Sequence, residues 1–318
     1  MAVEVLLDKL RRDRWLTTME YEQLLQEPKY PEARRLADRV RRERFGTTVY
    51  LRGLIDVGSI CEYDCPHCHQ RRSADCVRYR MRPREIIDCC EEAELMGIRS
   101  FLLRSGPDRF YTDKMLSGLI SRLRDHFPHC AVALAMGEGG RERLELLADA
   151  GADRYVLLQE TADRDRFLLT HPELDYDRRL HCLNELKDTG FQTGCGFLIA
   201  DQTPAELARE LKFLEEFQPH AVELVPMGAD PETVAYLISL IRLLLPEALI
   251  AAPDNTPAQV LAGANVLTLS LIRTRRSFPC CGGCRAQGPA TPESLAALHR
   301  TMADAGLEIT LAPAPWNG

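Results

Sequence analysis

The chain has 318 residues, of which 45% are hydrophobic and 27% are charged. These values are ordinary for a globular protein and exclude collagen-like, coiled-coil and wholly disordered chains. The net charge of −7 gives no general electrostatic basis for binding nucleic acid. No run approaches the ~18 apolar residues of a membrane helix, and the charge order at the N-terminus is the reverse of that in a secretory signal. We therefore expect a cytoplasmic protein without nucleic-acid or membrane partners.

Residues 1–47 are predicted to form a helical extension before the main domain. The stretches LLDKLRRDRW and PEARRLADRVRRERFG place apolar residues at helical spacing, and Pro31 and Gly46 are typical of the two ends of a helix. We expect these helices to pack on the domain that follows.

From residue 48 the chain repeats one unit, an apolar strand followed by an amphipathic helix. Strands are predicted at 49–57, 99–104, 131–136, 153–159, 191–199, 220–225, 248–252 and 264–270, and helices near 83–97, 112–127, 139–150, 174–189, 203–217, 231–245 and 256–262. Eight strands that alternate with helices favour a closed α/β barrel, the (β/α)8 TIM type, over an open doubly wound sheet. No GxGxxG motif follows the first strand, which argues against a dinucleotide-binding fold. We place the barrel at residues 48–271 and a C-terminal loop and helix at 272–318.

The chain contains 12 cysteines, and six of them fall in two tight groups. In a chain of this length, clustered cysteines are more typical of metal or redox sites than of disulfides. The other cysteines lie mostly inside periodic segments, where a thiol acts as a small buried hydrophobe.

The first group, Cys61, Cys65 and Cys68, directly follows the first predicted strand. Functional residues of a parallel barrel gather in the loops at the C-terminal ends of its strands. Three thiolates can hold three corners of a 4Fe–4S cube and leave one iron open to another ligand. Two alternatives remain, a zinc site completed by His67 or His69, and three unrelated cysteines.

This CxxxCxxC motif after the first strand of a barrel resembles the signature of the radical S-adenosyl-L-methionine (SAM) superfamily. The resemblance implies that the open iron binds SAM and that one electron cleaves it to methionine and a 5′-deoxyadenosyl radical. It covers about residues 5–270 and is strongest to the subgroup of the HydE-type FeFe-hydrogenase maturase and methylornithine synthase, which is related to biotin synthase. The segments that carry it are YLRGLIDVGSICEYDCPHC, LLRSGPDRFYT, VLLQETADRDRFLLTHP and YDRRLHCLNELKDTGFQTGCGF.

The resemblance also implies roles for single residues. Cys61, Cys65 and Cys68 would ligate the cluster, and His67 stands where relatives have an aromatic residue that touches the adenine. The loop of Ser105 and Gly106 would line the SAM amino group.

Two charged residues are implied in the same way. Glu160 matches a carboxylate near the SAM ribose or amino group, and Arg179 matches the arginine that binds the SAM carboxylate. The alternatives are a surface acid for Glu160 and a solvated charge, like its neighbour Arg178, for Arg179. Asp153 and Arg154 are expected to form structural pairs.

The segments GFLIADQT, VPMGADPETV and APDNTPAQVLAGANV are shorter than the corresponding loops of relatives, and Pro107 stands where relatives usually have Glu. The lysine-binding residues of the mutase have no counterparts here. We therefore expect a HydE-like enzyme with a small-molecule or organometallic substrate and an electron donor such as flavodoxin or ferredoxin. The alternatives are an amino-acid mutase and a cluster-binding scaffold that does not cleave SAM productively.

The second group, Cys280, Cys281 and Cys284, precedes a helix expected at about 292–305. It resembles the C-terminal cysteines that hold an accessory Fe–S cluster in some maturases, although Cys280 is adjacent to Cys281 rather than several residues upstream. A redox or metal-binding pair and inert thiols are the alternatives.

Overall fold

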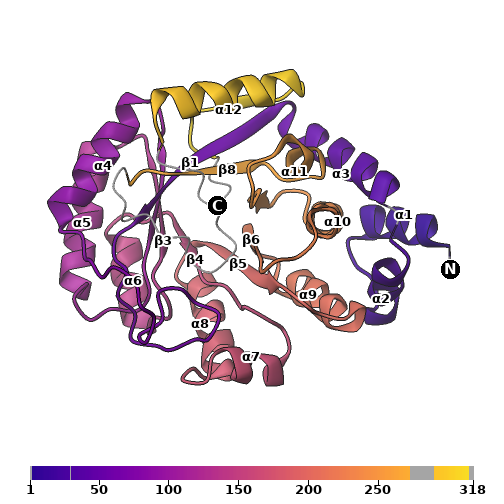
Figure 1. Ribbon diagram of the computed structural model, residues 1–318, viewed down its shortest axis with the longest axis horizontal. Coiled ribbons are helices and arrows are strands. Elements are labelled where there is room, and N and C mark those ends of the chain that lie inside the picture. The colour runs from indigo at the N-terminus through magenta and orange to yellow at the C-terminus, as the bar shows by residue number, and fades with distance from the viewer. Residues whose placement is uncertain (1, 29, 273–289, 315–318) are drawn as a thin grey trace.

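The computed structural model describes residues 2–28, 30–272 and 290–314. Eight parallel strands form the wall of a barrel in the order β7-β6-β5-β4-β3-β2-β1-β8 (Figure 1). They are β1 (Thr48–Asp56), β2 (Ser100–Arg104), β3 (Ala131–Ala135), β4 (Arg154–Val156), β5 (Gln192–Ile199), β6 (Ala221–Pro226), β7 (Leu249–Ile250) and β8 (Val266–Ser270). A single bridge between Ala251 and Val266 joins the two ends of this order, so the barrel is nearly closed. The predicted (β/α)8 fold is confirmed.

Helices follow the successive strands and surround the barrel (Figure 1). They are α4 (Pro83–Leu95), α5 (Asp113–His126), α6 (Arg141–Asp149), α8 (Tyr176–Asp188), α9 (Pro204–Phe217), α10 (Pro231–Leu244) and α11 (Pro257–Leu261), which confirms the predicted helices. Proline occupies the first turn of α4, α9, α10 and α11, where its missing N–H is not needed. The short helix α7 (Arg164–Thr170) was not predicted, because seven residues are too few for a periodic pattern. No helix within the described ranges is long and apolar enough to cross a bilayer.

The N-terminal helices α1 (Val3–Asp13), α2 (Thr18–Gln26) and α3 (Tyr30–Phe45) lie against α9 and α10 (Figure 1). Their fully buried leucines, such as Leu7 and Leu10, belong to the same apolar core as the barrel. Two hydrogen bonds fix the contact: the Tyr21 hydroxyl donates to Glu215 at 2.8 Å, and the Tyr236 hydroxyl donates to the Leu24 carbonyl at 2.9 Å. The N-terminal extension therefore packs against the barrel through a shared apolar core and side-chain hydrogen bonds.

The C-terminal segment contributes α12 (Pro292–Asp304), which confirms the predicted helix, and a strand that was not predicted. This strand, β9 (Glu308–Thr310), pairs in parallel with residues 48–50 of β1. The pairing is possible because β2 meets β1 only from Gly53 onward, which leaves the start of β1 open on that side.

Polar pairs occupy the N-terminal end of the barrel interior. Arg52 forms an ion pair with Glu223 at 2.5 Å, and Arg154 donates to Gln192 at 2.5 Å and to the Ala314 carbonyl at 2.6 Å. An apolar layer follows toward the C-terminal end, formed by Leu54, Leu102, Ala133 and Val156. The candidate site therefore lies at the opposite, C-terminal mouth.

The structural roles expected for Asp153 and Arg154 are confirmed. The Asp153 carboxylate accepts from Arg124 at 2.5 Å and from the Val132 amide at 2.7 Å, while Arg154 is buried in the pairs described above.

Candidate active site

Cys61, Cys65 and Cys68 lie on the loop after β1, and all three line one cavity of about 200 Å³ at the C-terminal mouth of the barrel. The Cys68 amide donates to the Cys65 carbonyl at 3.0 Å, which forms a turn between the two thiols. None of the cysteines in the described part of the chain is joined in a disulfide. The loop therefore presents three thiols to a common space.

The cysteine loop is held in place by the side chain of Arg78. Its guanidinium donates to the carbonyls of Ser59 at 2.6 Å, Gln70 at 3.0 Å, Arg71 at 2.7 Å and Ala74 at 2.9 Å. Five donors in a rigid fork suit this task, because carbonyls from both ends of the loop converge on one group. Sequence reasoning missed Arg78, since only folding brings these carbonyls together.

The thiols are partly buried, and this affects their ionisation. Burial, followed by the neighbouring thiols of Cys68 and Cys61, raises the pKa of Cys65 to about 12. Burial also raises the pKa of Cys61. The thiols of Cys61 and Cys65 are therefore protonated at neutral pH until a metal's positive charge replaces their protons, which is the behaviour expected of metal ligands.

The loop after β2 approaches the cysteines closely at Gly106. A Cβ atom at this position would lie 2.7 Å from Cys61 Cβ and 2.8 Å from Cys61 Sγ. Any residue other than glycine would therefore clash with the Cys61 side chain. Ser105 and Gly106 both line the cavity. Asp108 does not, because its carboxylate pairs with Arg80 at 2.7 Å.

Glu160 stands just beyond β4 in a left-handed conformation, with φ of 70°. Its backbone amide donates to the Gly196 carbonyl at 3.1 Å, and its carbonyl accepts from the Leu198 amide at 3.0 Å. Both backbone groups of Glu160 are therefore hydrogen-bonded to β5. Burial disfavours its charge, but His171 and Arg179 outweigh burial and lower the pKa of Glu160. One carboxylate oxygen, Oε2, is buried without a hydrogen-bond partner. Glu160 thus presents an ionised, unsatisfied acceptor.

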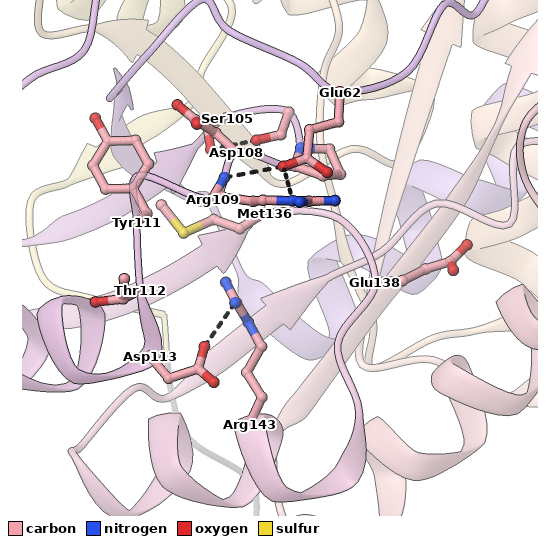
Figure 2. A pocket seen from close by; sticks show the side chains of 12 residues that line it. Glu62, Ser105, Asp108, Arg109, Tyr111, Thr112, Asp113, Met136, Glu138 and Arg143 are labelled. Carbon is pink, nitrogen blue, oxygen red and sulfur yellow. Dashed lines mark hydrogen bonds and ion pairs between the residues drawn. The ribbon is translucent and has the colours of Figure 1, made fainter.

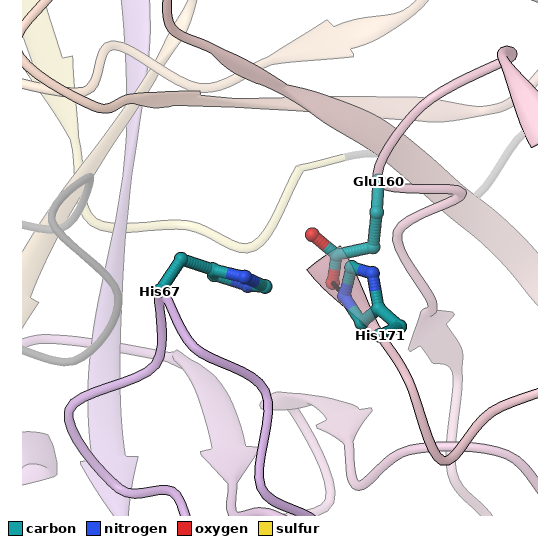
Figure 3. Close-up of side chains that lie close together, drawn as sticks. All are labelled: His67, Glu160 and His171. Atoms are coloured by element: carbon teal, nitrogen blue, oxygen red, sulfur yellow. Dashed lines mark ion pairs between the residues drawn. The ribbon is translucent and has the colours of Figure 1, made fainter. Parts of the chain in front are cut away.

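Two imidazoles flank this carboxylate (Figure 3). His171 Nε2 lies 3.8 Å from Glu160 Oε1, and the His171 ring stacks on Phe167 with centroids 4.6 Å apart. The His67 ring meets His171 edge to face at 4.9 Å, and its Nδ1 is buried without a partner. Burial lowers the pKa of His67, so this ring is neutral at neutral pH. His171 was not predicted, because it follows α7, the helix that the sequence pattern did not indicate.

The side chain of Thr170 contacts the ring of His171. The Thr170 hydroxyl donates its single hydrogen to the Arg166 carbonyl at 2.9 Å and lies 2.9 Å from His171 Nδ1. His171 is thus held at Nδ1 by Thr170, and its Nε2 faces Glu160.

Arg179, the arginine selected from the sequence, lines the same cavity and is buried. Its Nε donates to Glu138 at 2.8 Å and its NH1 to the Leu158 carbonyl at 2.6 Å, while Glu160 lies 4.0 Å away. The side chain of Arg178 is 69% exposed. The two neighbouring arginines therefore differ in environment, and Glu138, which pairs with both, was not selected from the sequence.

The residues fit a three-cysteine cluster with a charged organic cofactor beside it. Three thiols share one space, and the unsatisfied atoms of Glu160 and His67 require hydrogen-bond partners that the described protein does not supply. The buried guanidinium of Arg179 adds a group that suits a carboxylate. His69, the other candidate zinc ligand, is exposed and does not line the cavity.

A larger cavity of about 360 Å³ is also lined by residues 105–107 (Figure 2). Its charged side chains largely pair with one another, through Arg143 with Asp113 at 2.7 Å and Arg109 with Glu62 at 3.1 Å. None of the three cysteines lines it. We therefore place the site in the smaller cavity. Cys280, Cys281 and Cys284 lie outside the described residues.

Comparison with known proteins agrees with this geometry. The family model of the radical SAM superfamily matches residues 55–241. The FeFe-hydrogenase maturase subunit HydE of Thermotoga maritima is 32% identical over 256 residues, which cover 73% of each chain. The 3-methylornithine synthase of Methanosarcina acetivorans is 23% identical over 278 residues, or 80% of this chain and 77% of that protein.

Two solved structures share the fold. A crystal structure of methylornithine synthase superposes with a TM-score of 0.84 at 20% identity and covers 96% of this chain and 97% of that one. The maturase HydG superposes with a TM-score of 0.83 at 18% identity, covering 98% of this chain and 76% of that one. At such identities the likeness concerns the fold.

Proposed function

Since this chain belongs to the radical SAM superfamily, we propose that it is a HydE-like enzyme that acts in the maturation of a metallocofactor. Members of the superfamily are enzymes that use a 4Fe–4S cluster and SAM. The observation that carries the proposal is the convergence of three thiols, Glu160 and Arg179 on one cavity. The 32% identity with the HydE maturase supports the finer assignment over the mutase.

Cys61, Cys65 and Cys68 would hold the cluster. When bound, the cluster and SAM together supply reductive cleavage of SAM and abstraction of hydrogen from the substrate. The cysteine loop holds its thiols in one place through the Arg78 contacts, and Gly106 leaves room beside Cys61. The protein's contribution at this end of the cavity is to position the cluster.

The remaining residues bind and orient SAM. Arg179, fixed by Glu138 and the Leu158 carbonyl, pairs with its carboxylate. Glu160 accepts hydrogen bonds from its ribose hydroxyls or ammonium through the unsatisfied Oε2. His67 presents a neutral ring to the adenine, and the loop of Ser105 and Gly106 lines the amino group.

The substrate enters from the C-terminal mouth, where the described part of the chain places short connections after three of the strands. Residues 200–203 join β5 to α9, residues 227–230 join β6 to α10, and residues 251–256 join β7 to α11. A free amino acid needs a closed pocket with fixed groups for its ammonium and carboxylate. The short connections after β5, β6 and β7 support an organometallic, larger or macromolecule-bound substrate, with flavodoxin or ferredoxin as the electron donor.

The test is to reduce the anaerobically reconstituted protein with SAM and candidate substrates deuterated at their C–H positions. Formation of 5′-deoxyadenosine with deuterium transfer from an organometallic precursor is the expected result. Lysine-dependent formation of methylornithine would instead establish the mutase function. Reduction without any 5′-deoxyadenosine, in protein that carries an intact cluster, would contradict both.

A further inference from the structure

Glu210, on α9, is buried and lies outside the cavity. Its Oε1 accepts from the Thr161 hydroxyl at 2.7 Å and from the Ala162 amide at 2.8 Å. Its Oε2 accepts from the same amide at 2.9 Å and faces the Gln159 amide nitrogen at 3.5 Å. One carboxylate of the outer helix layer thus contacts three residues at the end of β4.

These three residues bracket Glu160. A left-handed conformation costs a residue other than glycine about 1–2 kcal/mol, so the neighbouring contacts must hold Glu160 at its φ of 70°. The backbone of β5 supplies part of this hold, and Gln159 adds to it by accepting from the Gly196 amide at 2.8 Å. Glu210 fixes Thr161 and Ala162, the two residues that follow Glu160. Neither of them pairs with β5 in the described structure.

The surroundings of Glu210 make its charge costly. No cation of the described chain lies within ion-pair distance of it, and the groups that face it are Arg209 of its own helix, Tyr176 of α8 and Cys195 of β5. Burial raises the pKa of Glu210 to about 7 against the opposing effect of its hydrogen bonds. Tyr176 also donates to the Ala162 carbonyl at 3.1 Å. Side chains from both α8 and α9 therefore form hydrogen bonds with the turn that follows Glu160.

The protonation state decides how many donors Glu210 can serve. An ionised carboxylate is an acceptor only and matches the hydroxyl, the backbone amide and the side-chain amide that point at it. A protonated carboxyl must donate one hydrogen, which only the Thr161 hydroxyl among these three contacts can accept, so Thr161 would no longer donate and the remaining hydrogen bonds would lose the assistance of the negative charge. The turn is therefore held more firmly when Glu210 is charged.

We propose that Glu210 is a positioning residue that locks the turn after β4 and thereby aims the Glu160 carboxylate at SAM. The hydrogen bonds from the turn to Glu210 are stronger when Glu210 is ionised and weaker when it is protonated. The affinity for SAM should therefore depend on pH near neutrality. This inference rests on the proposed role of Glu160 in binding SAM.

The experiment measures the dissociation constant of SAM by titration calorimetry on anaerobically reconstituted holoenzyme between about pH 6 and pH 8.5. Wild type, Glu210→Gln and the control Glu216→Gln, an exposed residue of the same helix, are compared. We expect Glu210→Gln to bind SAM roughly five- to twenty-fold more weakly at the upper pH. Wild type should approach the variant as the pH falls through about 7, whereas the control should follow wild type throughout.

A purely structural role would lower thermal stability without changing the shape of this pH profile. Coincident profiles of wild type and Glu210→Gln, at equal cluster content, would overturn the inference. Thr161→Val, which removes one donor and leaves the carboxylate intact, should give a smaller loss and serves if Glu210→Gln does not fold.

Glu160→Gln separates this inference from the proposed function. If that change leaves SAM affinity unaltered, the proposed SAM site is wrong regardless of Glu210. If it weakens SAM, the double variant Glu160→Gln with Glu210→Gln should lose no more than Glu160→Gln alone. Additive losses would show that Glu210 acts elsewhere and would contradict the proposed coupling.

Discussion

Arg179 and Glu138 form a buried ion pair at the mouth of the barrel, with side chains only 6% and 7% exposed and Nε 2.8 Å from Oε1. The pair joins α8 to the loop after β3, so it fixes a guanidinium at the edge of the cysteine cavity. Its neighbour Arg178 reaches the same carboxylate only at 3.4 Å and from the solvent side. Adjacent arginines on one helix therefore have separate environments.

We expect Arg179→Ala to weaken SAM binding ten- to a hundred-fold, because loss of a charged hydrogen-bond partner typically costs ~1.5–3 kcal/mol. Arg178→Ala is the matched control and should change the dissociation constant little. Calorimetric titration of the holoenzyme with SAM measures both. Equal, small effects from the two changes would identify Arg179 as a structural residue only.

Glu138→Ala should destabilise the fold by about 3 kcal/mol, since it leaves the buried Arg179 charge without its carboxylate partner. Denaturant unfolding of the cluster-free protein measures this loss. Glu142→Ala, at an exposed position on the neighbouring helix α6, should lie within about 0.5 kcal/mol of wild type. A Glu138 variant as stable as wild type would mean that the pair contributes nothing net.

Replacement of Cys61, Cys65 and Cys68 by alanine should abolish the reconstituted 4Fe–4S signal that these thiols are proposed to hold and leave the barrel folded. The loop lies outside the apolar core, so circular dichroism should be unchanged. Cys76→Ala is the control, because Cys76 lies near the same loop but does not line the cavity. A triple variant with an unaltered low-potential signal would assign the cluster to other cysteines.

Gly106→Ala should reduce cluster incorporation, because the added methyl group would stand 2.8 Å from the Cys61 sulfur. Iron and sulfide content per chain after reconstitution measures the effect. Gly118→Ala provides a matched control in α5, where nothing lies within 4 Å of the added Cβ. That change should leave iron content normal and stabilise the helix by about 0.5–1 kcal/mol. Full incorporation in Gly106→Ala would show that the loop moves aside freely.

The unfolding free energy of the cluster-free protein should depend on pH because Glu210 titrates. Its pKa is raised from 4.5 to about 7 by burial, so the folded state holds a proton that the unfolded state releases as the pH rises through this interval. Stability from this group is present at low pH and is lost by about pH 7, by up to about 3 kcal/mol. Glu210→Gln should lack this loss, so the difference between the two unfolding free energies should grow from pH 5 to pH 8. Parallel pH curves would contradict the raised pKa.

Local patterns in the sequence were sufficient for the barrel and for the cysteine loop. The alternation of strands and helices needs only periodicity and end signals, such as Thr203 and Pro204 at the start of α9, which act within one or two turns. Cys61, Cys65 and Cys68 likewise lie within a single loop, so the sequence was sufficient to predict that the three thiols share one cavity. Glu160 and Arg179 were selected by resemblance, and the structure brings both to the cavity of those thiols.

Other features depend on contacts between segments that are distant in the chain. Glu138 and Arg179 are 41 residues apart, and Glu210 is 48 residues from Ala162, yet each pair touches. Parallel closure of the barrel brings the ends of successive strands to one rim and stacks their helices behind them, and no local pattern encodes which side chains then meet. The same holds for β9, whose three residues form a strand only because the start of β1 offers an open edge. The sequence by itself therefore determined the main strands and helices of the barrel and the grouping of three cysteines in one loop, whereas the tertiary structure alone decided how the residues around that loop are held.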